Sequence, residues 1–226
     1  MGDIVLIALL LLVGPQDLAP AGTEAAAVEA VFERYKQALV AGDGATAQAL
    51  VDAQTLQTFE RLRELALGGS QEEVRGLSFI ERLLVVSMRH ALEREEIETM
   101  DLAALIETAM GEGWIAPQTL AQLDIGEIVV EGDRARGEAI SGLQPPASGQ
   151  SADAEVELYY RFVREEGEWK FQFASLIETL DALVAELTAA LGTDEDQLIF
   201  MLVESFTGRR VLPEVWSTPP DGGGDG

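Results

Sequence analysis

The clearest hydrophobic pattern in the chain lies between Ala154 and Ile177, where apolar and polar residues alternate on both sides of Glu166-Gly167. Alternation with a period of two predicts β-strands, and the pair at the centre predicts a tight turn between them. The register that this turn sets places three pairs on one face: Phe162 with Phe171, Tyr160 with Phe173, and Arg164 with Trp169. The opposite face is polar and includes Gln172, so we expect an aromatic hairpin with one buried face.

A second hairpin is predicted from Ile125 to Ile140, around the turn pair Gly132-Asp133. Its register pairs Gly126 with Ala139 and Ile128 with Gly137 on the apolar face.

Apolar residues spaced by three and four predict helices on both sides of these strands. The expected helices span residues 25–40, 45–51, 55–67, 70–92 and 101–110 before the strands, and residues 176–191 and 193–206 after them. The order predicts an α+β fold: a curved antiparallel sheet of about four strands, packed on N-terminal helices, with added C-terminal helices (177–207).

We place the α+β domain at residues 22–218. The two ends of the chain outside it lack the periodic spacing of apolar residues that predicts its helices and strands. Ile4 to Val13 is a short apolar run, followed by a helix breaker and the small residues around Ala21, which is typical of a secretory signal peptide over residues 1–21. The basic residues that usually precede such a run are missing, and a buried core segment is the alternative. Residues 219–226, PPDGGGDG, predict a disordered tail.

Composition narrows the functional classes. The 226 residues include no cysteine, which excludes disulfides, thiolate nucleophiles and zinc–thiolate or iron–sulfur sites. The net charge of −25 disfavours binding to nucleic acid or to an anionic membrane surface. Arginine far outnumbers lysine and alanine is abundant, which is typical of a GC-rich genome. We therefore expect an exported bacterial protein, periplasmic or extracellular, with no stable membrane insertion after signal cleavage.

Three segments together resemble the NTF2-like superfamily, also called SnoaL-like or the cystatin-like cone. They are a helix of the type AVEAVFERYKQALVAGD (27–43), the strand pair IVVEGDRA (128–135) and the strands around GEWK (156–173). The resemblance covers about a third of the chain and is closest to secreted bacterial members of unassigned function. The resemblance implies a curved sheet that encloses a conical pocket. The superfamily includes isomerases, dehydratases, cyclases and binding modules, so the resemblance does not indicate one function. No catalytic acid or histidine of the superfamily can be carried over to a position in this sequence.

The candidate ligand-binding residues are Tyr35, Trp114, Tyr160, Arg136 and Arg161. A buried tyrosine needs a partner for its hydroxyl, and Trp114 lies on a predicted loop at the rim of a pocket. The two arginines lie on the polar strand faces, where they could hold an anionic ligand or pair with neighbouring glutamates; we favour the pairing.

We predict no metal site, no catalytic residue and no cofactor. The single histidine, His90, cannot build a multi-histidine site, and the acidic run from Glu93 to Asp101 lacks the spacing of a calcium loop. Our leading hypothesis is an exported, non-catalytic module that binds a small apolar ligand or a protein. The alternatives are an isomerase- or dehydratase-type enzyme that uses a buried carboxylate and a tyrosine, and a purely structural assembly domain. Homodimerisation is left open.

Overall fold

The computed structural model describes residues 21–112, 114, 120–140, 158–177, 180–181, 184, 188 and 192–217. The predicted disordered tail and, Ala21 apart, the predicted signal peptide lie outside the described residues, as does most of the loop between the hairpins. Within the described ranges, no helix has the length and apolar character needed to cross a membrane.

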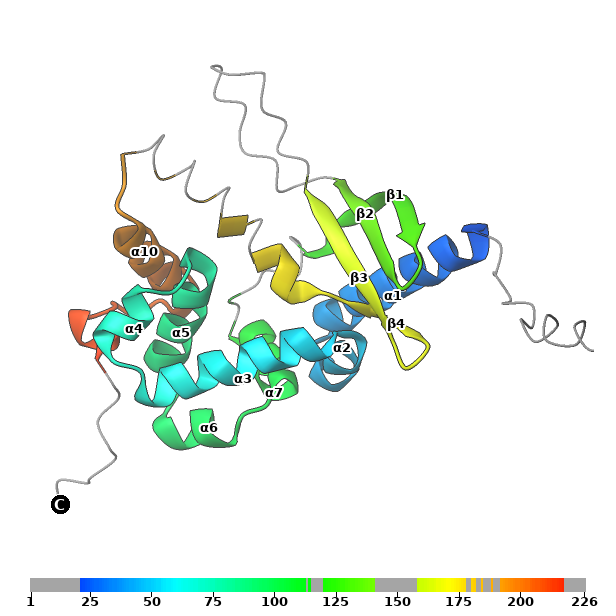
Figure 1. Ribbon diagram of the computed structural model, residues 1–226. Coiled ribbons are helices and arrows are strands. Elements are labelled where there is room, and N and C mark those ends of the chain that lie inside the picture. The colour runs from blue at the N-terminus through cyan, green and yellow to red at the C-terminus, as the bar shows by residue number, and fades with distance from the viewer. Residues whose placement is uncertain are drawn as a thin grey trace, which may run out of the picture.

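The order of elements is helices, then an antiparallel sheet, then helices, which confirms the predicted α+β class (Figure 1). The elements are α1 (Ala21–Ala41), α2 (Gly44–Leu50), α3 (Ala53–Gly68), α4 (Gln71–Arg75), α5 (Phe79–Ala91), α6 (Arg94–Thr99), α7 (Leu102–Gly111), β1 (Asp124–Glu131), β2 (Arg134–Ile140), β3 (Tyr159–Glu165), β4 (Glu168–Phe171), α10 (Glu195–Thr207) and the 3-10 helix η1 (Pro213–Trp216). Residues 173–177 are also helical.

The aromatic hairpin has the predicted register at its tip. Phe162 lies opposite Phe171, and Arg164 lies opposite Trp169. Glu166 and Gly167 both have positive φ, at 52° and 86°, as a tight hairpin turn requires. The predicted pair of Tyr160 with Phe173 is wrong, because β4 ends at Phe171 and Phe173 already belongs to the following helix.

The first hairpin departs from its predicted register at one end. Ile128 lies opposite Gly137 as expected, but Ile125, not Gly126, lies opposite Ala139, because the register shifts between Ile125 and Ile128. An extra residue of this kind is a β-bulge, and it turns Ile125 towards the inner face of the sheet. A Cβ atom on Gly137 would lie 2.3 Å from Cδ1 of Ile125, so the glycine leaves the space that this side chain occupies.

Helix α1 packs against the inner face of the sheet, whose strand order is β1-β2-β3-β4 (Figure 1). The Phe32 ring lies 4.7 Å from the Tyr160 ring, and the Tyr35 ring lies 4.9 Å from the Phe171 ring, between centroids. At the hairpin tip, Trp169 donates its indole N–H to Glu24 of α1 at 2.9 Å. This aromatic core forms the sheet half of the molecule.

A second hydrophobic core lies among the helices α3 to α7, α10 and η1, the helical half. The single helix predicted over residues 70–92 is wrong: α4 ends at Arg75, and α5 begins after Ser78. Glu81 accepts a hydrogen bond from the backbone N–H of Ser78 at 3.2 Å, so a second N-terminal cap starts the second helix. The acidic run after Leu92 forms the short helix α6.

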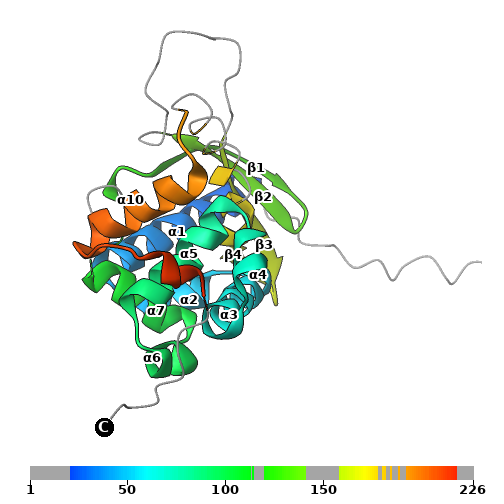
Figure 2. The ribbon, with the colours of Figure 1, turned by 90° about the vertical axis from the view of Figure 1, so that its left-hand side faces the viewer.

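The C-terminal helix α10 lies beside α5 in both ribbon views (Figures 1 and 2). Ile199 and Val203 of α10 are fully buried in the helical core. Arg82 of α5, which is also buried, forms ion pairs with Glu195 and Asp196 in the first turn of α10. The described residues from α10 to η1 therefore pack as part of the helical half.

Candidate functional site

A cavity of about 380 Å³ lies where the helical half meets the sheet half. The helix that follows β4 forms part of its wall through Phe173, Ala174, Leu176, Ile177 and Leu180. The other walls come from both cores. The lining residues from the sheet half are Phe32, Tyr35, Lys36, Leu39, Val51, Leu120, Leu123, Tyr160 and Phe171, and those from the helical half include Thr55, Thr58, Phe59, Leu62, Ile80, Leu83, Leu84, Ser87, Leu102, Leu105, Ile106, Ala109, Met110, Trp114 and Phe206.

The wall of the cavity is almost entirely hydrocarbon. Its described lining residues include no aspartate, glutamate or histidine. The single cationic side chain among them, Lys36, is already engaged: its ammonium lies 2.6 Å from a Glu33 carboxylate oxygen and donates to the carbonyl of Leu123 at 3.1 Å. Such a wall suits an apolar ligand, because it offers no free charge to compensate the lost hydration of an ion.

Tyr35 is one of three predicted site residues that the structure brings to the cavity. It is 8% exposed, and its ring packs against Phe171. Burial raises the pKa of Tyr35 well above its ordinary value, because the phenolate would lose its hydration. The hydroxyl is therefore protonated throughout the physiological pH range.

Tyr160 and Trp114 reach the cavity from opposite halves of the molecule. Tyr160 is 2% exposed and Trp114 is 8% exposed, and both line the cavity. Within the described part of the chain, neither the Tyr160 hydroxyl nor the Trp114 indole N–H has a hydrogen-bond partner. Burial, with a smaller contribution from the charge of Asp124, raises the pKa of Tyr160 to about 12. Both groups are therefore protonated, buried donors with no acceptor among the described residues.

The buried carboxylate of Asp52 lies behind the cavity wall. Its Oδ1 accepts from the backbone N–H of Thr55 at 3.0 Å and from the Thr55 hydroxyl at 2.5 Å, and its Oδ2 accepts from the Gln172 amide at 3.0 Å. The Thr55 hydroxyl in turn accepts from the backbone N–H of Ala174 at 3.2 Å. Asp52 therefore joins the start of α3 to the end of the hairpin. Gln172, predicted on the polar face, is partly buried by this contact.

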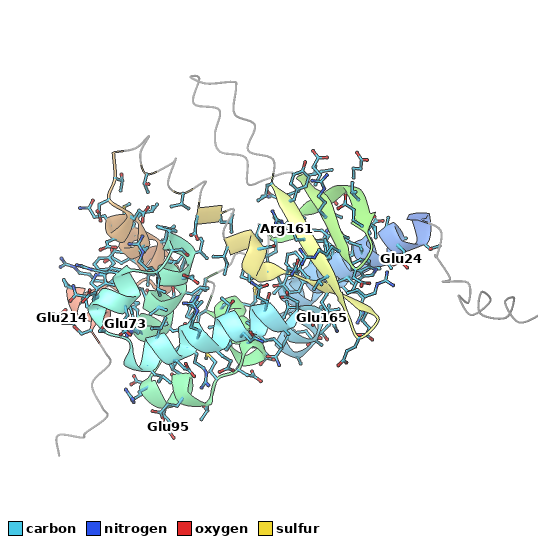
Figure 3. The ribbon with its side chains drawn as sticks, viewed as in Figure 1. Glu24, Glu73, Glu95, Arg161, Glu165 and Glu214 are labelled. Atoms are coloured by element: carbon cyan, nitrogen blue, oxygen red, sulfur yellow. The ribbon has the colours of Figure 1, made fainter. Side chains whose placement is uncertain are left out.

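The structure does not bring Arg136 and Arg161 to the cavity. They lie opposite each other on β2 and β3, and both are exposed on the outer face of the sheet; Figure 3 labels Arg161 there. The Arg136 guanidinium lies 5.3 Å from the Tyr159 ring centroid. Among the described residues, neither arginine has a carboxylate within ion-pair distance, so the predicted pairing with glutamates is not seen there.

The part of the cavity wall that comes from α5 and α7 could not be predicted from the sequence. Leu83, Leu84 and Ile106 follow an ordinary helical stripe, and nothing in their spacing distinguishes a cavity wall from a filled core. Trp114, predicted at a rim, is instead buried in the wall, where its backbone N–H donates to the carbonyl of Ala109 at 2.8 Å.

Among the described residues, no cluster of three or more acidic or histidine side chains could hold a metal ion. Comparison of the chain with protein-family models, with curated proteins and with solved structures gives no match.

Proposed function

We propose that this protein binds a small apolar ligand in the cavity between its two cores. The observation that carries the proposal is a cavity of about 380 Å³ with a hydrocarbon wall between the two hydrophobic cores. Native cores are close-packed, and voids larger than a water molecule are few. The volume falls within the range of roughly 300–1,000 Å³ that is typical of ligand sites.

The proposal includes export from a bacterial cell and an NTF2-like origin. The apolar run before Gly14 supports export, and the three segments that resemble the superfamily support the origin. The packing of α1 on the inner face of the sheet agrees with the cone that the resemblance implies. A protein partner is the other occupant that the sequence leaves open.

The enzyme alternative has less support from the cavity. A proton-abstracting isomerase or dehydratase needs a carboxylate or another base within hydrogen-bond reach of the substrate. Asp52, the buried acid nearest to the wall through its contact with Thr55, has hydrogen bonds to both of its oxygens. The assembly alternative requires no cavity.

Binding of the neutral fluorophore N-phenyl-1-naphthylamine to the full chain tests the proposal. We expect saturable binding with a blue-shifted emission and a stoichiometry near one. Ala174→Phe and Ala109→Phe place a ring in the cavity from different walls, so each should weaken binding at least about tenfold, a loss of ~1.4 kcal/mol.

The matched control is Ala30→Phe, the same substitution on the exposed face of α1. It should bind the fluorophore like the unchanged chain, and thermal melts of all three variants check that they fold. Equal binding by all three would locate the fluorophore outside the cavity and contradict the proposal.

A further inference from the structure

The outer face of the sheet, which points away from α1, carries three exposed arginines on neighbouring positions; Figure 3 labels one of them, Arg161. Arg136 of β2 lies directly opposite Arg161 of β3, and Arg134 precedes Arg136 by two residues. Alternate residues of a strand share a face, so all three side chains start from the same side of the sheet. Arg134, Arg136 and Arg161 are called the arginine cluster below.

The arginine cluster lacks the counter-charge that would balance it. Like charges directly opposite each other on neighbouring strands repel and destabilise the pair. Among the described residues, no carboxylate lies within ion-pair distance of any of the three arginines. The chain has 40 acidic residues against 15 basic ones, so acids are abundant but do not pair here. An external anion would relieve this repulsion.

The Arg136 side chain is already oriented by a neighbour. Its guanidinium lies 5.3 Å from the centroid of the Tyr159 ring, on the next strand. Such stacking uses the flat face of the guanidinium and leaves its edge available to donate two parallel hydrogen bonds to a carboxylate. A side chain that is held in place before binding loses less conformational entropy when the partner arrives.

We propose that the arginine cluster is a docking surface for a short acidic segment of a partner protein, in which carboxylates alternate with apolar residues. Partly buried valines accompany the arginines: Val129 lies opposite Arg136, and Val163 lies opposite Arg134. Basic and apolar side chains therefore alternate on this face. An extended segment with the complementary alternation would place carboxylates on the arginines and apolar side chains on the valines.

The surroundings of the arginine cluster favour a short acidic segment over a long polyanion. Exposed glutamates border it on both sides, because Glu131 lies opposite Arg134 and Glu138 follows Arg136 by two residues. A nucleic acid or an anionic membrane would extend past the arginines onto these acids and onto a chain of net charge −25. A symmetric pair of these faces would place arginines against arginines, which disfavours a second copy as the occupant.

This inference goes beyond the proposed function, because the cavity is lined from the inner face of the sheet by Tyr160 and Phe171. None of the three arginines lines the cavity. The outer face and the cavity can therefore be tested separately.

Two peptides that differ only in charge test the inference. One alternates three aspartates with valines, and the other has asparagines in place of the aspartates; both have blocked ends and a neutral coumarin label. Fluorescence anisotropy with the full chain is measured at physiological salt, where a Debye length of about 8 Å weakens repulsion by distant acids. The aspartate peptide should bind at least about tenfold more tightly than the asparagine peptide, since only carboxylates form charge-assisted hydrogen bonds with guanidinium.

The double substitution Arg136→Gln with Arg161→Gln should lower the affinity for the aspartate peptide by about 5–20-fold, as the loss of two exposed charge pairs implies. The matched control is Arg34→Gln with Arg210→Gln, the same change in net charge at exposed positions on α1 and after α10. It should bind the peptide like the unchanged chain. Thermal melts show whether both variants fold.

The inference is overturned if the aspartate peptide does not bind, if both peptides bind equally, or if the control loses as much affinity as the cluster variant. Tighter binding to phosphatidylglycerol vesicles or duplex DNA than to the peptide, lost in the cluster variant, would replace the acidic segment by a phosphate surface. Self-association that the cluster variant abolishes would replace it by a second copy. Either result would overturn the proposed partner, whereas the cavity is tested independently by the neutral fluorophore.

Discussion

Arg89, in the last turn of α5, shows how one side chain can join three segments of the helical half. Its guanidinium donates to the carbonyls of Leu65, Ala66 and Gly69 at the end of α3, and to those of Val215, Trp216 and Ser217 at the end of η1. Helix ends leave carbonyls without partners inside the helix, and these attract a cation. One arginine here satisfies the ends of two elements that are distant in the sequence.

We expect Arg89→Lys to lower the free energy of unfolding by about 2–3 kcal/mol, because a lysine ammonium has three donors and lacks the planar fork of guanidinium. Denaturant melts measure the change. The matched control is Arg210→Lys at an exposed position, which should change stability by less than ~0.5 kcal/mol. A similar loss in both variants would mean that the network around Arg89 does not stabilise the fold.

The aromatic hairpin is the element that supports both the sheet and the cavity. Phe171 packs against the rings of Tyr35, Tyr160 and Phe162, and it also lines the cavity. Its neighbour Gln172 donates to the buried Asp52, so the two successive residues stabilise the fold through different contacts. The alternation predicted from the sequence therefore holds for the rings, but it does not make Gln172 an inert surface residue.

Phe171→Ala should lower the free energy of unfolding by about 3–5 kcal/mol, as is usual when a buried aromatic ring is removed. Gln172→Ala should cost about 1–3 kcal/mol, because it leaves Asp52 with an unpaired oxygen. The surface control is Arg161→Ala, expected below ~0.5 kcal/mol. Denaturant melts compare the three variants, and a Phe171→Ala loss no larger than that of the control would contradict the register of the hairpin.

At the scale of the whole molecule, the helical half and the sheet half depend on each other. The described residues of the helix after β4 contact both cores: Leu180 packs against the sheet core and Val184 against the helical core. The acidic side chains labelled in Figure 3 are spread over both halves, with Glu73, Glu95 and Glu214 on the helical half and Glu24 and Glu165 on the sheet half. Acidic side chains therefore lie on both halves of the molecule.

Removal of the chain after Ile177 should abolish cooperative folding. It exposes the face of α5 that covers Ile199 and Val203, and it leaves the buried Arg82 without its two carboxylates. Breaking a buried ion pair in this way typically costs about 3–5 kcal/mol. We expect residues 22–177 to aggregate, whereas residues 22–217 should melt like the full chain. A soluble 22–177 fragment with a cooperative melt would show that this part of the chain folds without the C-terminal helices.

The sequence by itself determined the local features of this protein. The alternation around Glu166-Gly167 defined the aromatic hairpin, and the spacing of apolar residues defined most helices, because strand and helix periods are properties of neighbouring residues. Tyr35, Trp114 and Tyr160 could be predicted as site residues because each combines a large apolar ring with one polar group that needs a partner when buried. The signal peptide and the NTF2-like resemblance stay predictions.

Tertiary structure alone decided how these elements meet. The bulge that turns Ile125 inwards depends on pairing with β2, whereas the break between α4 and α5 is local, because Glu81 caps the backbone N–H of Ser78. The cavity arises because two cores meet without filling the space between them. The apolar residues of a helix have the same spacing whether they face a packed neighbour or a cavity, so the sequence does not distinguish the two. For the same reason only the structure could place Arg136 and Arg161 outside the site and leave the Tyr160 hydroxyl and Trp114 N–H without partners among the described residues.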